Sequence, residues 1–336
     1  MGLVDNLMTN EEQTRSERAT PSDEEPRSIF CNIPLPIPTT RFAEKIKSPE
    51  LIPIVRAFVQ NGDNIGDLLA MPLTIMTAGL RDSFKNLDFI RAATITDTFG
   101  PDLDKYGLDP DITNKINDEM SRIWNEETEP KFIAARRKLT MSVLYMPSLS
   151  GGVRVLLLSC VVTAWTTFES LASDLWVQLV SSRTATLGRQ VASHVAKNSR
   201  DYGRDKSEPV VHLRDLSRHD FDIRPCLGEI LAAKFDFTKL SGIRRAYQAL
   251  FPNDTQIRDA LKVKDLQLLQ GYRHSIVHKG GIVDDRFRET TGLTGCIKGQ
   301  FIPQQEDIVV RLIGSAFHAG EQLLLSADLW LSEHPL

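Results

Sequence analysis

The residues with the clearest chemical potential lie together in the segment YRHSIVHKGGIVDD, residues 272–285. Four residues separate Arg273 from His278, and a second imidazole, His274, directly follows the arginine. A guanidinium is permanently charged and matches the geometry of phosphate oxygens. An imidazole has an ordinary pKa of about 6.5 and can accept or donate a proton at neutral pH. This set of side chains is suited to acid–base chemistry at a phosphate group.

The spacing between the arginine and the second histidine is not specific by itself, because it recurs elsewhere in the chain. Arg189 with His194 and Arg214 with His219 have the same separation. Both of these pairs lie in a polar segment without the apolar stripe of a packed helix. At most one of the pairs is expected to be a site, and the helical setting of residues 272–285 favours Arg273 and His278.

The orientation of the side chains follows from the geometry of a helix. At about 100° per residue, His274 and His278 lie on one face, about 200° from the core-facing positions Tyr272 and Ile276. Both imidazoles are therefore predicted to point away from the core. Arg273 lies about 140° from His278, so a single straight helix is not expected to direct both at one small group. A two-fold dimer would bring the same helix end from two subunits to one cleft.

The segment RHSIVHKGGIVDD resembles the signature of HEPN domains (higher eukaryotes and prokaryotes nucleotide-binding), specifically those of the RiboL-PSP-HEPN group. The family motif is an arginine, a polar residue, three to five further residues and a histidine, and Arg273, His274 and His278 match it in order. The resemblance covers about residues 150–335. It includes the segment TTFESLASDLW, where an acidic residue such as Glu169 often occurs. It implies an α-helical bundle that forms a homodimer and cleaves RNA without a metal ion or other cofactor.

The same resemblance implies a role for each site residue. A ribose 2′-hydroxyl would attack the adjacent phosphorus and leave a 2′,3′-cyclic phosphate and a 5′-hydroxyl. His278 is the candidate proton carrier, Arg273 would hold the phosphate oxygens, and His274 would orient either group or carry the second proton. Glu169 would hydrogen-bond the arginine. Simpler readings stay open, because His278 could serve only as a cation at the end of a helix dipole, and Glu169 only as an exposed polar residue.

Any contact with RNA is expected to be local, because the chain has no general positive charge. It carries 40 Lys and Arg against 44 Asp and Glu, a net charge of −4. Lys279, beside the site, and Arg183 and Arg189, in the polar segment, are candidates for contact with an RNA backbone. These charges could equally belong to a solvated loop.

The predicted fold class is all-α. Residues 1–47 are predicted to be a disordered tail, because they are charged and rich in Ser, Thr and Pro. Residues 48–150 are predicted to form a smaller, mostly helical domain of unknown role, with helical patterns at 54–59, 65–78 and 116–139. Residues 151–336 are predicted to form a HEPN-like helical bundle with a long crossover at 183–224. Its expected elements are helices at 153–181, 227–235, 241–251, 255–278 and 306–331, and a minor β-hairpin at 296–303 that turns at Lys298 and Gly299.

Composition limits the class of protein. Hydrophobic residues at 41% and charged residues at 25% are typical of a soluble globular chain. The four cysteines are far apart and form no CxxC pair, so they indicate reduced thiols and no metal site. The start of the chain has no apolar signal core, and the most apolar run, residues 155–165, is shorter than the roughly 20 residues of a membrane span. The sequence therefore predicts a cytoplasmic protein with no membrane contact.

Together these features predict a metal-independent HEPN-type endoribonuclease that acts as a homodimer on RNA. The resemblance also suggests a toxin or antiviral defence effector, with a regulatory partner or antitoxin. The alternative is a non-catalytic HEPN-like module that binds nucleotide or RNA, or that only dimerises. The absence of a general basic field favours this alternative.

Overall fold

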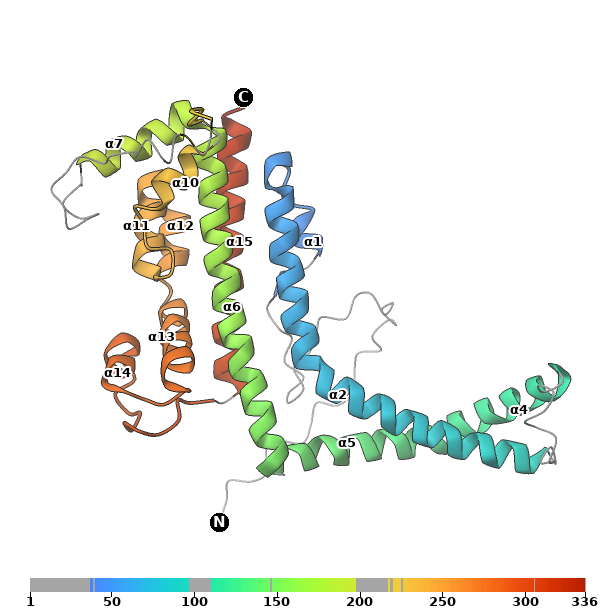
Figure 1. Ribbon diagram of the computed structural model, residues 1–336. Helices are drawn as coiled ribbons and strands as arrows, with labels where there is room; N and C mark the ends of the chain where they lie inside the picture. The colour runs from blue at the N-terminus through green and yellow to red at the C-terminus, as the bar shows by residue number, and fades with distance from the viewer. Residues whose placement is uncertain are drawn as a thin grey trace, which may run out of the picture.

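The computed structural model describes residues 37–38, 40–96, 110–145, 147–197, 217, 220–224, 226–304 and 306–335. These residues are mostly helical and contain no β-sheet, which confirms the all-α prediction (Figure 1). The α-helices are α1 (Thr40–Ala43), α2 (Ile52–Ile95), α4 (Pro110–Ile123), α5 (Glu129–Tyr145), α6 (Pro147–Ser182), α7 (Arg189–Lys197), α10 (Leu227–Ala232), α11 (Leu240–Leu250), α12 (Thr255–Lys262), α13 (Lys264–Lys279), α14 (Asp285–Thr291) and α15 (Glu306–Glu333). A 3-10 turn (Pro49–Leu51) and two π-helical turns (Trp124–Thr128 and Thr184–Gly188) join some of them.

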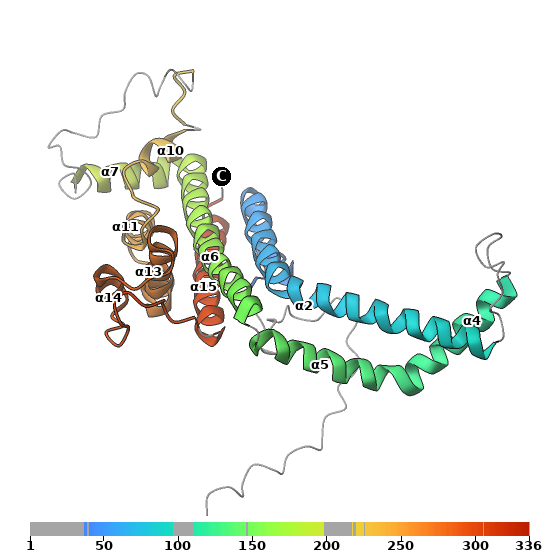
Figure 2. The same ribbon diagram turned by 60° about the horizontal axis from the view of Figure 1, so that its bottom comes forward.

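Three long helices form the centre of the bundle: α6, α15 and the first half of α2 (Figures 1 and 2). Apolar side chains recur on α6 at spacings of three and four, and Trp165, Phe168, Leu175 and Trp176 are completely buried. The prediction of a long core helix at 153–181 is therefore confirmed. Burial of so many large side chains on one helix fixes α6 as the support against which the shorter helices pack.

The short helices α10 to α14 lie along the side of α6 away from α2 (Figure 2). Two buried hydrogen bonds tie α11 to α6: Tyr247 Oη donates to the carbonyl of Ala172 at 3.0 Å, and Trp176 Nε1 donates to the carbonyl of Ala246 at 3.0 Å. Satisfied polar groups of this kind fix the register between two helices as well as their contact. The position of α11 matters, because its beginning forms one wall of the candidate site.

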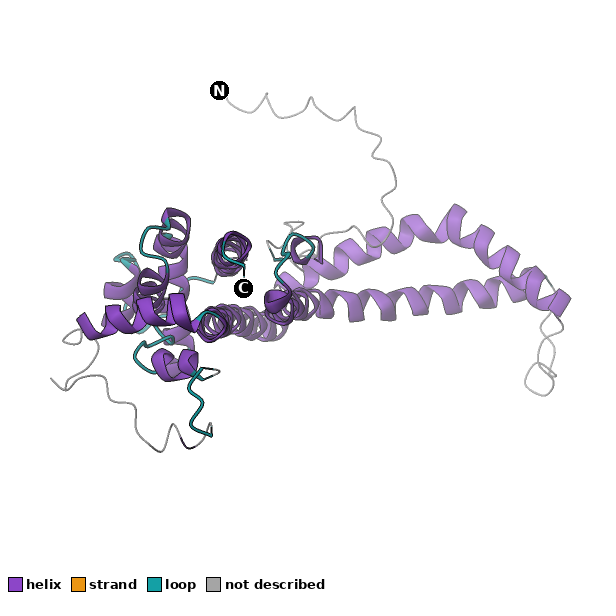
Figure 3. Cartoon of the chain, turned by 90° about the horizontal axis from the view of Figure 1, so that it is seen from above, coloured by secondary structure: helices purple, strands orange, loops and turns teal. Residues whose placement is uncertain are grey.

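The N-terminal half of the chain contributes to the same core, which the sequence did not indicate. α2 is one helix of 44 residues that includes the patterns at 54–59 and 65–78. Its first half buries Phe58, Ile65 and Leu69 in the main core, and its second half extends with α4 and α5 as a long arm (Figures 1 and 3). The predicted boundary at residue 150 falls inside α6.

The predicted tail is also partly ordered. Residues 1–36 lie outside the described part of the chain, but Phe42 and Ile46 are buried in the main core. The backbone N–H groups of Lys47 and Ser48 donate to the carboxylate of Asp328 on α15, at 3.1 and 2.7 Å. The prediction of disorder is therefore wrong for residues 40–47, which the structure describes as ordered against the core.

Two predicted elements near the site differ from the structure. The helix expected at 255–278 is broken at Val263, whose extended backbone (φ −53°, ψ 132°) separates α12 from α13. The apolar stripe had a gap here, because Lys264 and Asp265 occupy the positions where the stripe should continue after Leu261. The hairpin at 296–303 is replaced by one isolated antiparallel bridge, between Ile282 and Phe301.

Two helices, residues 151–182 of α6 and 307–333 of α15, are long and apolar enough by composition to cross a membrane. Residues 155–165, judged too short for a span, are thus part of a helix that is long enough. However, within each helix 56% and 61% of an apolar stretch of 18 residues are buried inside the bundle. More than half of each stretch therefore packs in the core of the protein.

Candidate functional site

The candidate site lies at the C-terminal end of α13. Gly280 (φ +61°) and Gly281 (φ +78°) adopt left-handed conformations that end the helix, close to the end predicted at residue 278. Ser275 reinforces this end, because its hydroxyl donates to the carbonyl of Ile282 at 2.9 Å and its own carbonyl accepts from Gly281 N at 3.0 Å. The last helical turn is therefore held in place by the chain that follows it.

One chain is enough to bring the three motif residues to the same pocket. Arg273, His274 and His278 all line a cavity of about 230 Å³. The two imidazole rings lie 4.7 Å apart between centroids. A single chain therefore brings Arg273 and His278 to one cavity, and the prediction that they meet at one small group in a two-fold dimer stays a prediction. The pocket extends along more than one turn of α13, so it receives side chains that are not on a single narrow stripe. The remaining lining residues are Thr238, Lys239, Gln270, Gly271, Arg286, Phe287 and Thr290.

Both histidines face away from the core, as the helical geometry predicts. His278 is exposed and His274 is partly buried, whereas Tyr272 on the opposite side is completely buried. Burial lowers the pKa of His274, and the positive charges of Arg286 and His278 lower that pKa further, against a smaller opposite effect from Asp284. His274 is therefore neutral at neutral pH and able to accept a proton.

The pocket gathers positive charge. Lys239, Arg273 and Arg286 contribute cations from three different elements: the start of α11, α13 and α14. Lys239 is balanced by Asp236 at 2.6 Å, whereas Arg286 is exposed. Arg273 Nε is buried and donates to no atom of the described residues. An anion in the pocket would supply a negative charge opposite Arg273 and Arg286.

Glu169 lies on α6 within electrostatic reach of this arginine. Its carboxylate accepts a hydrogen bond from Trp165 Nε1 at 2.8 Å. Burial raises the pKa of Glu169, while this hydrogen bond and the charge of Arg273 act in the opposite direction. The predicted hydrogen bond between Glu169 and Arg273 does not occur in the described structure. Glu169 is instead placed to act on the arginine as a nearby charge.

The predicted RNA-contacting residues are not gathered at this pocket. Arg183 follows α6 and pairs with Glu50 at 3.0 Å, with only 9% of its side chain exposed, so its charge has a structural partner. Arg189 is exposed at the start of α7, at the end of the bundle where α6 ends (Figure 1). Lys279 is exposed beside His278 but does not line the cavity. Of these three residues, only Lys279 adjoins the site.

The alternative Arg–His pairs have different settings. Arg189 and His194 lie on α7, away from α13 and α14 (Figure 1). Arg214 and His219 lie outside the described residues. The pair on α7 is therefore a natural control for the pair on α13, because it has the same spacing on a helix of the same chain.

The sequence did not indicate that Lys239 and Arg286 line the pocket, nor that Arg286 lies on a helix, α14. α14 begins after Asp284, whose carboxylate caps the helix by accepting from Phe287 N at 2.7 Å. An aspartate followed by a short charged segment is a helix-start signal, and it would have placed Arg286 in the first turn of a helix beside α13. Lys239 had no comparable signal, because only the packing of α11 on α6 brings it to the pocket.

No group of three or more His, Cys, Asp or Glu side chains in the described structure is arranged to hold a metal ion. Cys160, Cys226 and Cys296 are free thiols. Burial raises the pKa of the Cys160 thiol to about 12, so it is not a nucleophile at neutral pH. The charged and titratable groups that line the pocket are guanidinium, ammonium and imidazole side chains.

Comparison of the chain with protein-family models, with curated proteins and with solved structures found no match. The HEPN resemblance of residues 272–285 stays a prediction that these comparisons do not test.

Proposed function

We propose that this protein is a HEPN-type endoribonuclease that acts as a homodimer and needs no metal ion. One observation carries the proposal: Arg273, His274 and His278 share a single positively charged pocket at a helix end. The cationic side chains of this pocket can bind the oxygens of a phosphodiester. Its two imidazoles can supply an acceptor and a donor for the two proton transfers that cleavage requires.

The geometry suggests how the reaction would run. Arg273 and Arg286 would hold the phosphate oxygens and stabilise the negative charge that grows on them. Neutral His274 would take the proton from the ribose 2′-hydroxyl as the bond between O2′ and phosphorus forms. His278, as the general acid, would give a proton to the 5′-oxygen as the bond between phosphorus and that oxygen breaks. Positioned acid–base groups of this kind each contribute roughly 10² to 10⁴ in rate.

The products would be a 2′,3′-cyclic phosphate and a 5′-hydroxyl, with no net gain or loss of protons by the enzyme. DNA lacks the 2′-hydroxyl and would not be cleaved. Glu169, near Arg273, would help to hold the guanidinium in place. The burial of Glu169 keeps water from screening this interaction fully.

The exposed end of α13 supports the proposal of a dimer. Val277 is 49% exposed beside His278, although it is a large apolar residue. A symmetric contact through this end would cover Val277 and place two copies of the pocket near each other. The predicted cytoplasmic location, the role as a toxin or defence effector and the partner antitoxin stay predictions.

The test is cleavage of a labelled single-stranded RNA by the purified full-length chain in the presence of EDTA. Arg273→Ala and His278→Ala should each slow cleavage by about 10² or more. His194→Ala removes the imidazole of the equally spaced pair on α7 and should leave the rate unchanged. Circular dichroism and size-exclusion chromatography would show that each variant is folded and has the same oligomeric state.

Unchanged cleavage by both Arg273→Ala and His278→Ala would overturn the proposal. RNA binding without cleavage by the wild-type chain would instead support a non-catalytic HEPN-like module. The net charge of −4 is the observation that favours this second candidate.

A further inference from the structure

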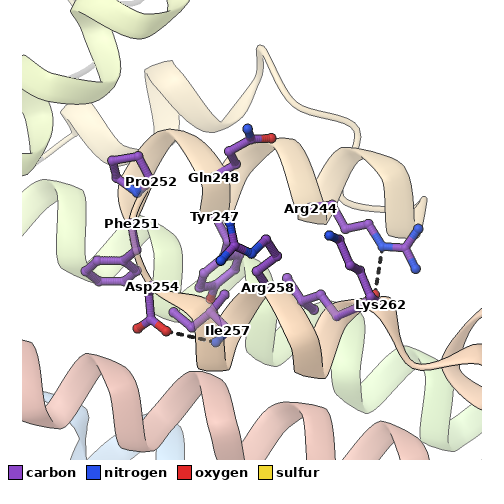
Figure 4. Close-up of a pocket in the computed structure, with 10 residues that line it drawn as sticks. Arg244, Tyr247, Gln248, Phe251, Pro252, Asp254, Ile257, Arg258 and Lys262 are labelled. Atoms are coloured by element: carbon purple, nitrogen blue, oxygen red, sulfur yellow. Dashed lines mark hydrogen bonds between the residues drawn. The ribbon is translucent and has the colours of Figure 1, made fainter.

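A second pocket lies between α11 and α12, where the chain turns back on itself (Figure 4). Its volume is about 380 Å³, and it shares no lining residue with the pocket on α13. The lining consists of Arg244, Tyr247, Gln248, Phe251, Pro252, Asp254, Ile257, Arg258, Leu261 and Lys262. Nothing in the proposed cleavage reaction uses these residues.

Three cations surround this pocket. Arg258 and Lys262 are exposed, and neither forms an ion pair with another described residue. Arg244 is partly buried, and its Nε donates to the carbonyl of Leu261 at 2.7 Å (Figure 4). This hydrogen bond fixes the guanidinium and leaves its two terminal nitrogens for another acceptor.

The acidic residue of the lining does not neutralise these cations. Asp254 is the N-cap of α12, and its carboxylate accepts from Ile257 N at 2.9 Å. Burial lowers the pKa of Arg244, which shows that its positive charge is held in poor contact with water. A ligand with negative charge would relieve this cost, and the fixed position of Arg244 reduces the entropy lost when it binds.

The floor of the pocket is apolar. Phe251, Ile257 and Leu261 are buried there, and the hydroxyl of Tyr247 is already engaged by the carbonyl of Ala172 at 3.0 Å. Pockets of this kind bind ligands that combine a charged group with an apolar or planar body. Inorganic phosphate alone would leave the floor without a contact.

We propose that the α11–α12 pocket binds a phosphate-bearing ligand with a planar, partly apolar body. Free nucleotides and the nucleotide units of an RNA strand share this chemistry. Arg258 and Lys262 contact the phosphate, Arg244 contacts it from the opposite wall, and the planar ring lies against Phe251. Lys239, the N-cap of α11, lines the first pocket, and Arg244 of α11 lines the second, about 7.5 Å further along the helix axis and about 140° around it.

Isothermal titration calorimetry on the full-length chain tests this proposal with three probes. They are inorganic phosphate, adenosine 5′-monophosphate and a 2′-O-methyl RNA oligonucleotide, which has no free 2′-hydroxyl and cannot be cleaved. Arg258→Glu and Lys262→Glu reverse exposed charges and leave the core intact. Lys264→Glu is the matched control, because Lys264 is an exposed cation two residues further along that does not line the pocket.

The proposal expects at least one of the two nucleotide probes to bind, with affinity reduced about tenfold or more in Arg258→Glu and in Lys262→Glu. Lys264→Glu should change it less than about twofold. Weakened binding of the monophosphate identifies a free nucleotide as a ligand, and weakening confined to the oligonucleotide identifies an RNA strand.

The proposal is overturned if neither nucleotide probe binds, if the two pocket variants bind like the wild type, or if the control loses as much affinity as they do. Inorganic phosphate that binds as tightly as the nucleotide probes also overturns it, because the apolar floor would then contribute nothing. RNA cleavage by the same variants is a separate readout, since the catalytic residues lie in the other pocket.

Discussion

The contact between α13 and α14 offers a sharp test of how the first pocket is built. Gly271 lies on α13 in the wall of this pocket, and a Cβ atom added there would lie 2.5 Å from Thr291 Cγ2 of α14. Ordinary carbon contacts are about 3.5 to 4.0 Å. Gly271→Ala should therefore push α14, which carries Arg286, about 1 Å away from α13.

The expected magnitude follows from two opposing effects on the free energy of unfolding. Overpacking of this kind costs about 1 to 3 kcal/mol. Replacing a helical glycine with alanine raises the free energy of unfolding by about 0.5 to 1 kcal/mol. The two ranges combine to a net loss between about 0 and 2.5 kcal/mol, so Gly271→Ala should lower the free energy of unfolding by about 1 kcal/mol. A displacement of about 1 Å at a catalytic group can slow a reaction up to about 10²-fold, so RNA cleavage should also fall.

A second substitution makes this prediction specific. Thr291→Ser removes the methyl group that the new Cβ meets, but keeps the hydroxyl that donates to the carbonyl of Phe287 at 2.6 Å. The double variant Gly271→Ala/Thr291→Ser should recover both stability and cleavage. Urea denaturation and a single-turnover cleavage assay measure the two quantities. A Gly271→Ala protein as stable and active as the wild type, or a double variant that is not rescued, would refute this reasoning.

Three further predictions concern two contacts of the core and Glu169, which lies near Arg273. Asp328→Ala leaves the buried Ser48 N–H and the partly buried Lys47 N–H without this acceptor, and should lower the free energy of unfolding by about 1 to 3 kcal/mol in urea denaturation. Gly320→Ala places a Cβ 2.4 Å from Phe58 Cζ, and a destabilisation of about 1 to 3 kcal/mol would confirm that α2 packs on α15, whereas wild-type stability would contradict that contact. Burial raises the pKa of Glu169, so its contribution to stability is full below the ordinary carboxyl pKa and is lost as the pH rises through the raised value. Glu169→Gln should therefore increase stability at pH 7 and reduce its pH dependence above the ordinary carboxyl pKa, yet slow RNA cleavage; unchanged denaturation curves from pH 4 to 8 would contradict this.

The helices that repeat an apolar stripe without interruption were predictable from the sequence. α6 and α15 are examples, because each buries residues at spacings of three and four along its length. The glycine end of α13 was predictable for a different reason, since Gly280 and Gly281 favour the left-handed conformations that they adopt. These elements were predictable because apolar spacing and glycine conformation are properties of neighbouring residues in the chain.

The arrangement of the N-terminal half was not predictable from local patterns. Pro72 lies inside α2 and Gly62 and Gly66 precede it, so the sequence suggested several short helices. Packing against α6 and α15 supports one continuous helix instead, which is a tertiary effect. The sequence also could not show that Phe42 belongs to the main core, because the contact joins residues far apart in the chain.

The candidate site was predictable in its residues but not in its assembly. Helical geometry correctly placed His274 and His278 on the outer face of α13. It did not show that Arg273 enters the same pocket, because the walls come from α11 and α14. Arg286 and Lys239 belong to those walls, and only the packed structure reveals their place.

The end groups of cleaved RNA test the central claim most directly. The full-length chain would be incubated with an RNA of defined sequence in EDTA, and the fragments analysed by mass spectrometry. The account predicts a 2′,3′-cyclic phosphate on one fragment and a 5′-hydroxyl on the other, with no cleavage where the 2′-hydroxyl is replaced by hydrogen. Fragments that carry a 3′-hydroxyl and a 5′-phosphate, or cleavage at the 2′-deoxy position, would contradict the roles given to Arg273, His274 and His278.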